Sequence, residues 1–207
     1  MKHDIRIDVS KLHPYLQYKL KILMNKCEKQ NIYLIITEGY RTKEYQDQLY
    51  AKGRTTGKIG ETVTNARGSD YSSQHQWGIA FDIAIANPGH TWDTSYFVKV
   101  SNIAKGIGLG WGGDWTSPVD RPHFYLKKWG STPTPLKRQY GTFENFKKTW
   151  TAKITRKKGL NIWTKHFKKK KKFLKYDTTV DVLWKHLVVS KVKYGDTIGF
   201  VRSKYIK

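Results

Sequence analysis

Apolar residues recur at helical spacing near the start of the chain and gather into strand-like runs soon after it. Over residues 11–29, leucines and Cys27 recur every three or four positions, which predicts a helix with Ser10 as its N-cap. The β-branched run at 32–37 predicts a strand, because branched side chains favour extended backbone. The same criteria predict further helices at 42–53 and 94–108 and further strands at 77–85 and 121–126. Together these elements indicate an α+β fold for the first part of the chain.

The remainder of the chain shows short runs of alternating apolar and polar residues, with turns about every ten positions. Aromatic and β-branched side chains are frequent at the apolar positions, as is typical of strands. The segments that fit this pattern are 152–156, 159–164, 170–176, 179–185, 187–192 and 199–206. Strands this short and this evenly spaced predict a small all-β barrel.

Charge divides the chain at a similar place. The whole chain carries 39 Lys+Arg and 16 Asp+Glu, a formal net charge of +23. Residues 1–126 hold 16 basic and 12 acidic side chains, a net of +4, so the remainder carries +19. Gly130, Pro133 and Pro135 follow the less charged part, and such residues are typical of linkers. We therefore expect a first domain at 1–127, a linker at 128–148 and a second domain at 149–207.

Composition limits the class of protein. With 38% hydrophobic and 14% aromatic residues, the chain has enough apolar side chains for folded cores, which excludes general disorder. The single cysteine, Cys27, excludes an internal disulfide, and its place in a predicted helix indicates a buried apolar side chain. There is no apolar run of the roughly 20 residues that a membrane helix needs, and no signal-peptide core at the start, so we expect a cytoplasmic protein. The positive charge predicts a polyanionic partner: nucleic acid, an anionic membrane or an anionic wall polymer.

Two segments concentrate side chains that can perform chemistry. The segment 72–84 offers His75 and Asp82, and the segment 114–126 offers Asp120 and His123. Two imidazoles and one carboxylate are ligand types of an open catalytic zinc site, which keeps one position for water. A further acid near the ion can accept a proton from that water. The spacing therefore permits a metal site without choosing between the two acids.

Four motifs occur in the same order as in one known family. They are EGYRTKEYQDQLYAKGR at 38–54, SxHxxGxAxD at 73–82, LGWGGDW at 109–115 and DxPHF at 120–124. In these motifs the chain resembles the D-Ala-D-Ala carboxypeptidase/VanY superfamily of metallopeptidases. Within it, the motifs look most like those of the L-alanyl-D-glutamate endopeptidases of phage endolysins and bacterial autolysins, since the carboxypeptidase branches usually carry Glu in place of Asp120. The resemblance implies an α+β zinc peptidase domain over 1–127, with a small antiparallel sheet and flanking helices.

The resemblance also implies roles for individual residues. His75, Asp82 and His123 are expected to ligate one zinc ion, although cobalt or manganese also suits such ligands. Asp120 is expected to act as the catalytic base. Arg41 of the GYR motif is expected to supply positive charge, either to the carbonyl oxygen in the transition state or to a substrate carboxylate.

Three further residues are expected on the substrate side of this site. They are Gln46, Ser73 and Trp111. Ser73 is expected to order the loop that carries His75 by hydrogen bonding, since a water bound to zinc removes the need for a serine nucleophile. Trp111 belongs to the glycine-rich LGWGGDW motif and is expected at the substrate site, where the wall of the cleft is favoured over a platform for sugar; a place in the core is the alternative.

The basic part of the chain resembles bacterial SH3-like (SH3b) cell-wall-binding domains at LNIW, 160–163, and GFVRSKYI, 199–206. Trp163 and Phe200 replace the Arg and Trp that are usual there. Five consecutive lysines, Lys168–Lys172, are open to three interpretations: a solvated loop, a nucleic-acid patch, or a site for the phosphate-rich teichoic acids of a Gram-positive wall. The third is favoured beside a peptidase, because it holds the enzyme near its substrate.

The sequence therefore predicts a two-domain, monomeric peptidoglycan hydrolase of the endolysin type. We expect it to cleave the L-Ala–D-Glu bond of the stem peptide after release from the host cytoplasm through a membrane pore, without a nucleic-acid or membrane partner. One alternative is a D,D-carboxypeptidase or another stem-peptide peptidase. Another, from a different class, is a basic nucleic-acid-binding protein with an inactive enzyme domain.

Overall fold

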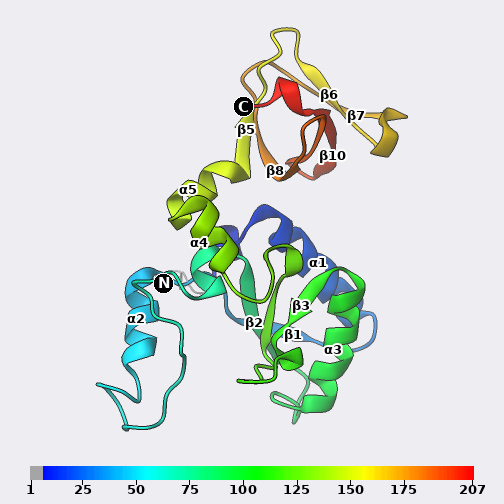
Figure 1. Cartoon of the computed structure of the whole chain (residues 1–207). Helices are drawn as coiled ribbons and strands as arrows, with labels where there is room; N and C mark the ends of the chain where they lie inside the picture. The colour runs from blue at the N-terminus through cyan, green and yellow to red at the C-terminus, as the bar shows by residue number, and fades with distance from the viewer. Residues whose placement is uncertain (1–6) are drawn as a thin grey trace, which may run out of the picture. The chain divides into compact units, whose positions relative to one another are not determined.

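The structure is a computed structural model of the chain, in which residues 7–207 are described. It contains two compact units, the first ending at Phe143 and the second spanning Glu144–Lys207 (Figure 1). Residues 128–148, the expected linker, contain two short helices, α4 (Thr134–Tyr140) and α5 (Phe143–Lys147). Over the described part of the chain, no helix combines the length and the apolar character needed to cross a membrane.

Helix α1 (Pro14–Glu28) confirms the helix predicted from the leucine spacing. It packs against helix α3 (Thr94–Gly106), which in turn packs beside the sheet (Figure 1). The buried side chains of α1 include Leu16, Leu20, Leu23 and Cys27. Burial raises the pKa of the Cys27 thiol to about 11, so this side chain stays protonated and acts as an apolar core residue.

The start of α1 differs from the prediction. We expected Ser10 as the N-cap, but the helix begins at Pro14, and the imidazole of His13 accepts a hydrogen bond from the Tyr15 N–H at 3.1 Å. Ser10 lies in the preceding 3-10 helix, η1 (Val9–Lys11). Proline at the first helical position explains the difference, because its fixed φ suits a helix start and its missing N–H is not needed there.

The sheet of the first unit is antiparallel throughout, in the order β1-β2-β4-β3. Its strands are β1 (Leu34–Glu38), β2 (Ala80–Ile85), β3 (Leu109–Trp111) and β4 (His123–Leu126). Three of them overlap predicted strands, whereas β3 lies in a segment for which the sequence predicted no strand. Every side chain of β2 is buried except Asp82, which is partly exposed. Strand β2, an inner strand of the sheet, therefore carries one ionisable side chain that reaches the edge of the core.

Two further elements position the site. Helix α2 (Lys43–Ala51) begins at the cap Thr42, whose side chain accepts from Tyr45 N, and it confirms the helix predicted there. The 3-10 helix η2 (Gln74–Trp77) directly precedes β2. The other short helices of the first unit are η3 (Gly112–Asp114) and η4 (Lys127–Trp129).

The second unit is built on a six-stranded sheet. Its strands are β5 (Thr151–Lys153), β6 (Leu160–Trp163), β7 (Lys170–Leu174), β8 (Thr179–Lys185), β9 (Val189–Tyr194) and β10 (Thr197–Arg202). All six overlap segments predicted as strands. They pair antiparallel in the order β5-β8-β9-β10-β6-β7, and within the described residues no strand pairing closes the sheet between β5 and β7. The short helices here are η5 (Lys148–Trp150), η6 (Lys165–Phe167) and η7 (Ser203–Tyr205).

The core of the second unit consists of small and branched aliphatic side chains. They are Ala152, Ile154, Leu160, Ile162, Leu174, Val180, Val182, Val192, Val201 and Ile206. In β6, β9 and β10 they alternate with less buried residues. Since successive side chains of a strand point to opposite faces, the intervening residues lie on the outer face of the sheet.

Candidate active site

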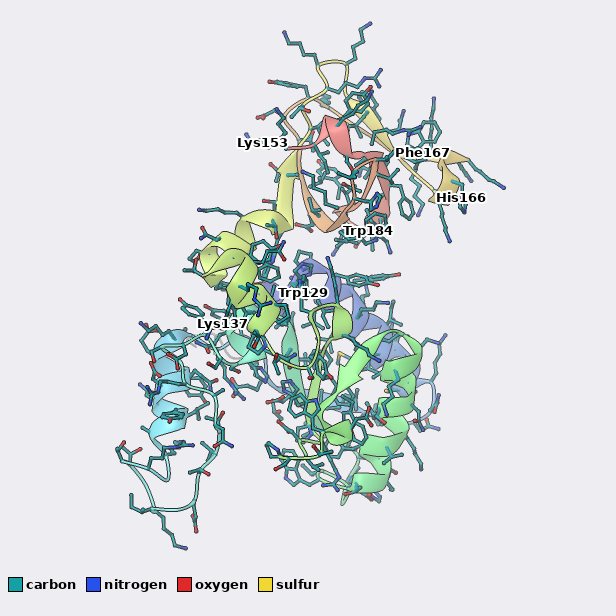
Figure 2. All side chains as sticks on the ribbon, in the orientation of Figure 1. Trp129, Lys137, Lys153, His166, Phe167 and Trp184 are labelled. Carbon is teal, nitrogen blue, oxygen red and sulfur yellow. The ribbon has the colours of Figure 1, made fainter. Side chains whose placement is uncertain are left out.

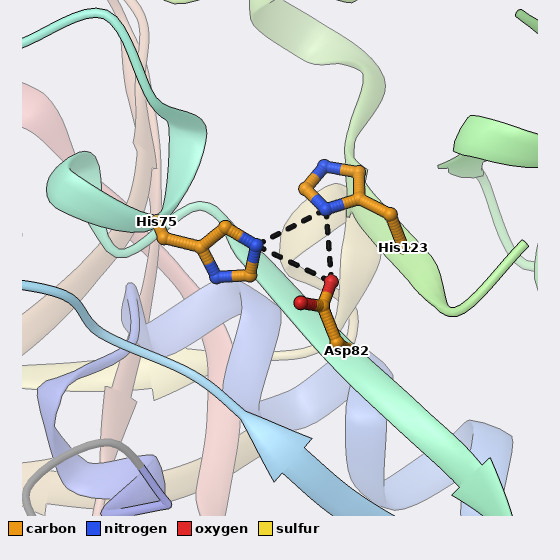
Figure 3. A group of neighbouring side chains, drawn as sticks. All are labelled: His75, Asp82 and His123. Carbon is orange, nitrogen blue, oxygen red and sulfur yellow. Dashed lines mark hydrogen bonds and ion pairs between the residues drawn. The ribbon is translucent and has the colours of Figure 1, made fainter. Parts of the chain in front are cut away.

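Three side chains that are distant in sequence meet in the first unit. His75 lies in η2, Asp82 in β2 and His123 at the start of β4, directly opposite Asp82 across the strand pair. Asp82 Oδ1 lies 2.9 Å from His123 Nδ1 and 3.3 Å from His75 Nε2, and the two ring nitrogens are 3.1 Å apart (Figure 3). The structure therefore brings together all three predicted metal ligands.

Each imidazole is oriented by a hydrogen bond at its outer nitrogen. His75 Nδ1 lies 2.7 Å from the carbonyl oxygen of Gly39, and His123 Nε2 lies 2.8 Å from Gln74 Oε1. The Gln74 amide is itself oriented, because its Nε2 donates to the carbonyl of Gly130 at 3.2 Å. Both outer nitrogens therefore carry the proton, and the inner nitrogens, His75 Nε2 and His123 Nδ1, present lone pairs.

This donor set fits a divalent cation. Two lone pairs and a carboxylate oxygen within 3.3 Å of one another repel unless a positive charge lies among them. Burial, assisted by Arg41, lowers the pKa of His75 to about 4, so protonation of this ring does not supply that charge at neutral pH. Two neutral imidazoles and a carboxylate are ligands that zinc prefers.

The backbone around His75 holds its ring in place. Ser73 caps η2: its Oγ accepts from the His75 N–H at 3.3 Å, and its own N–H donates to Gln76 Oε1 at 3.2 Å. Gly78 ends the turn with a φ of 61°, a left-handed conformation that glycine adopts without strain. Ser73 thus orders this loop by hydrogen bonding, and it also lines the cleft described below.

Arg41 lies beside the three candidate ligands and contacts one of them. Its Nη2 lies 3.2 Å from Asp82 Oδ2, and its Nη1 donates to Gln46 Oε1 at 3.3 Å. Its Nε lies 3.8 Å from Glu38 Oε1. Two carboxylates and one amide therefore hold the guanidinium, which also lines the cleft.

Gln46 is completely buried and lies behind the cleft. Its Nε2 donates to the carbonyl of Ala66 at 2.9 Å and to Thr64 Oγ1 at 3.3 Å, while its Oε1 accepts from Arg41. Thr64 and Ala66 line the cleft. Among the described residues, Gln46 thus links Arg41 to a cleft loop, whereas the sequence suggested a direct substrate contact.

A cleft of about 750 Å³ opens beside the candidate metal ligands. Arg41, His75, Asp120 and His123 line it, and the segments 63–66, 114–118 and 131–133 contribute further lining. Burial raises the pKa of Asp120, while His123 acts in the opposite direction. The cleft therefore contains a carboxyl group with increased proton affinity next to the His-Asp-His group, as general acid–base catalysis requires.

Trp111 lies in the core and not in the cleft. It is 7% exposed, its ring stacks on Phe124 with centroids 6.4 Å apart, and its indole N–H donates to the carbonyl of Arg121 at 2.7 Å. Trp115 lines the cleft instead, with its ring centroid 5.0 Å from that of His123. Both tryptophans belong to one motif, so the sequence indicated the segment but not the side chain that faces the cleft.

Sequence reasoning missed the two groups that orient the imidazoles. Gln74 is an uncharged residue next to His75, and nothing in its spacing distinguishes it from other glutamines. The carbonyl of Gly39 belongs to the backbone of the GYR motif and carries no side-chain signal at all. The proximity of the GYR motif to the histidine motif becomes visible only in the folded chain, so the sequence offered no signal for either group.

Comparisons with known proteins point to one family of peptidases. Residues 67–126 match the D-alanyl-D-alanine carboxypeptidase family. The chain is 38% identical over 128 residues to the peptidoglycan L-alanyl-D-glutamate endopeptidase CwlK of Bacillus subtilis, an alignment that covers 56% of this chain and 74% of that protein. It is 30% identical over 131 residues to the L-alanyl-D-glutamate peptidase of a Listeria phage, covering 60% of this chain and 42% of the phage protein. The solved structure of the Serratia marcescens L-Ala D-Glu endopeptidase ChiX aligns with 20% identity and a TM-score of 0.45, over 59% of this chain and 87% of that one.

Proposed function

This chain belongs to the family of metallopeptidases that includes the D-alanyl-D-alanine carboxypeptidases and the peptidoglycan L-alanyl-D-glutamate endopeptidases, and we propose that it hydrolyses the L-Ala–D-Glu bond of the peptidoglycan stem peptide. The 38% identity to an endopeptidase of that name, over 74% of its length, supports this bond over a terminal D-Ala. The observation that carries the proposal is the meeting of His75, Asp82 and His123 beside a cleft that Asp120 lines.

We propose that His75, Asp82 and His123 hold one zinc ion. When bound, zinc acidifies a water molecule and polarises the scissile carbonyl. Gly39 and Gln74 keep the lone pairs of the two imidazoles directed at one point, which lowers the cost of reorganisation when the site is filled. The ion pair with Arg41 orients the Asp82 carboxylate in the same way.

Asp120 is the proposed proton carrier. It accepts a proton from the attacking water and passes it to the amine of D-glutamate as the peptide bond breaks. Burial raises the pKa of Asp120, so its carboxyl group retains the proton between these two events more readily than an exposed aspartate does.

Arg41 is the proposed source of positive charge on the substrate side. Negative charge grows on the carbonyl oxygen of L-alanine during attack, and the substrate also carries carboxylates. Because Asp82 and Gln46 already hold the guanidinium, Arg41 needs little rearrangement to meet either group.

We propose that the second unit is an SH3-like cell-wall-binding module whose ligand is an anionic polymer of a Gram-positive wall. The LNIW motif forms β6, and residues 199–202 of the GFVRSKYI motif lie in β10, which pairs with β6. The net charge of +19 from residue 127 onward, within the total of +23, supports an anionic partner. We further propose that the protein is a monomer and acts as an endolysin that reaches the wall from the host cytoplasm through a membrane pore.

Mass spectrometry of digested cell walls tests the proposed bond. The expected products carry new N-terminal D-Glu or D-isoGln ends, without freed D-Ala. Freed D-Ala in place of these ends would support the D,D-carboxypeptidase alternative. Intact walls after treatment with zinc-loaded protein would support the nucleic-acid-binding alternative, and a chelator should abolish hydrolysis until zinc is added back.

A further inference from the structure

One row of side chains crosses five strands of the second unit. Direct cross-strand partners join Trp184 on β8 to Lys191 on β9, and Lys191 to Phe200 on β10. They continue from Phe200 to Trp163 on β6, and from Trp163 to Lys170 on β7. Directly opposed residues of antiparallel strands lie on the same face. The face therefore carries three aromatic rings and two lysines in one line, which we call the aromatic–cationic row.

Burial shows that the row lies outside the core. None of its five members is buried, whereas neighbours on the same strands, such as Ile162, Val192 and Val201, are fully inside. The aliphatic core is contiguous without these rings. Three partly exposed aromatic side chains on an outer face, combined with lysines, indicate a surface that is available for binding.

Contacts between neighbouring side chains hold the row in place. The rings of Trp184 and Phe200 meet edge to face with centroids 5.9 Å apart. Lys170 Nζ lies 5.8 Å from the ring centroid of Trp163. Such contacts restrict the rotamers of the rings and the lysine, so less conformational entropy is lost when a ligand binds.

Phe167 extends the row beyond Trp163. It lies in the turn between β6 and β7 (Figure 2), and its ring centroid is 6.1 Å from that of Trp163. The guanidinium of Arg202 lies 4.9 Å from the ring centroid of Phe167. The φ of Phe167 is 57° and that of His166 is 62°, a left-handed conformation that side chains rarely adopt. The turn thus accepts backbone strain while it places an aromatic ring at the end of the row, beside the cation of Arg202 on β10.

We propose that the aromatic–cationic row binds a polymer of sugars or polyols joined by phosphodiesters, of the teichoic-acid type. Strands of a sheet are about 4.8 Å apart, so five strands extend over about 19 Å, enough for several repeating units. Lys170, Lys191 and Arg202 pair with the phosphates, and Trp184 offers an apolar ring face to a sugar. This inference rests on the wall-binding role proposed above and assigns to it a site and a ligand chemistry.

The position of the cations favours phosphate recognition over stacking of nucleic-acid bases. A stacked base needs an open ring face, yet Lys170 lies over Trp163 and Arg202 over Phe167. At Trp163 and Phe167, the row therefore presents charge where a base-binding platform presents an open ring.

The test compares two variants of the full chain that each lose two positive charges. The row variant carries Lys170→Gln and Lys191→Gln, and the matched control carries Lys157→Gln and Lys158→Gln, two exposed lysines in the turn before β6. Sedimentation measures binding to purified Gram-positive walls, to the same walls stripped of phosphodiester polymers with hydrofluoric acid, and to a single-stranded oligonucleotide.

The row variant is expected to bind untreated walls about tenfold more weakly than the control variant, since two phosphate contacts are lost. The affinity of wild type should be about tenfold lower for stripped walls than for untreated walls. Trp184→Ala, checked for folding by circular dichroism, should also bind untreated walls more weakly than wild type does. Equal affinities of the two lysine variants, or undiminished binding to stripped walls, would overturn the proposal. Tighter binding to the oligonucleotide than to untreated walls would overturn the proposal and identify nucleic acid as the ligand of the row.

Cleavage of a soluble stem peptide separates this inference from the proposed peptidase activity. The row lies outside the first unit, so both lysine variants should cleave the soluble peptide at the wild-type rate. Equal wall binding by the two variants, with cleavage intact, refutes the proposed binding site and leaves the proposed peptidase activity standing. Absence of cleavage by zinc-loaded wild type refutes the peptidase proposal instead.

Discussion

Replacing Gln74 by leucine should weaken zinc binding while the first unit stays folded. Gln74 Oε1 lies 2.8 Å from His123 Nε2 and accepts a hydrogen bond from its N–H, which leaves Nδ1 as the ligand atom. Leucine fills nearly the same volume but offers no acceptor. The imidazole then loses the contact that fixes its tautomer and its ring orientation.

The expected loss can be worked from this one contact. Removing one partner of a buried hydrogen bond costs about 1–3 kcal/mol, and His123 is 5% exposed, so water replaces little of the lost acceptor. Because about 1.4 kcal/mol corresponds to a factor of ten, the Kd for zinc should rise roughly 10- to 100-fold.

Competition with a chromophoric chelator at neutral pH measures this Kd, and circular dichroism checks the fold. Gln74→Glu is the matched control, because it keeps an acceptor at the same position and should bind zinc at least about tenfold more tightly than the leucine variant. Wild-type affinity in the leucine variant would refute the reasoning, and so would a glutamate variant as weak as the leucine variant.

Three further predictions concern other parts of the first unit. Asp120→Asn should lower kcat for stem-peptide hydrolysis by about 10²–10⁴, with an unchanged Kd for zinc, because it removes a proton acceptor but no ligand; a wild-type kcat would remove Asp120 from the mechanism. Burial, assisted by the charge of Lys128, lowers the pKa of His13 from 6.5 to about 3. As the pH falls below 6.5, His13 is therefore protonated in the unfolded chain while it stays neutral in the folded chain. The stability contributed by neutral His13 is therefore complete above that pH and is lost toward pH 3. From about pH 7 to about pH 5, the free energy of unfolding should fall by about 2 kcal/mol more in wild type than in His13→Asn, which retains a capping side chain; equal losses in denaturant titrations would contradict this. Gly110→Ala should cost about 1–3 kcal/mol of stability, because a Cβ there overlaps the ring of Tyr125; an unchanged Tm in calorimetry would show that the ring moves aside freely.

Elements whose side chains repeat a period could be predicted from the sequence, whereas strand β3 could not. The leucines of α1 and the alternating positions of β6, β9 and β10 each show their period several times. Strand β3 spans only Leu109–Trp111, and its pairing with β4 depends on residues distant in sequence. The helix start at Pro14 was available from the sequence, since proline favours the first helical position, but the serine upstream gave a competing cap signal.

The candidate site also contains residues that the sequence indicated and an arrangement that it did not. Residue types at motif positions indicated His75, Asp82 and His123, which the structure places together. Which of the two nearby tryptophans faces the cleft follows from contacts made on folding: the indole N–H of Trp111 donates to the carbonyl of Arg121, and its ring stacks on Phe124 in the core. Contacts of this kind join residues whose proximity arises only on folding, so no sequence pattern contains them.

Hydrolysis of a soluble peptide tests the central claim most directly. The substrate is a synthetic stem tetrapeptide that begins with L-Ala–D-Glu and ends in D-Ala, incubated with zinc-loaded protein and followed by mass spectrometry. The account predicts free L-alanine and a shortened peptide with N-terminal D-Glu, formed by wild type and nearly absent with Asp120→Asn. Release of D-alanine alone, or a peptide left intact by the zinc-loaded wild type, would contradict it.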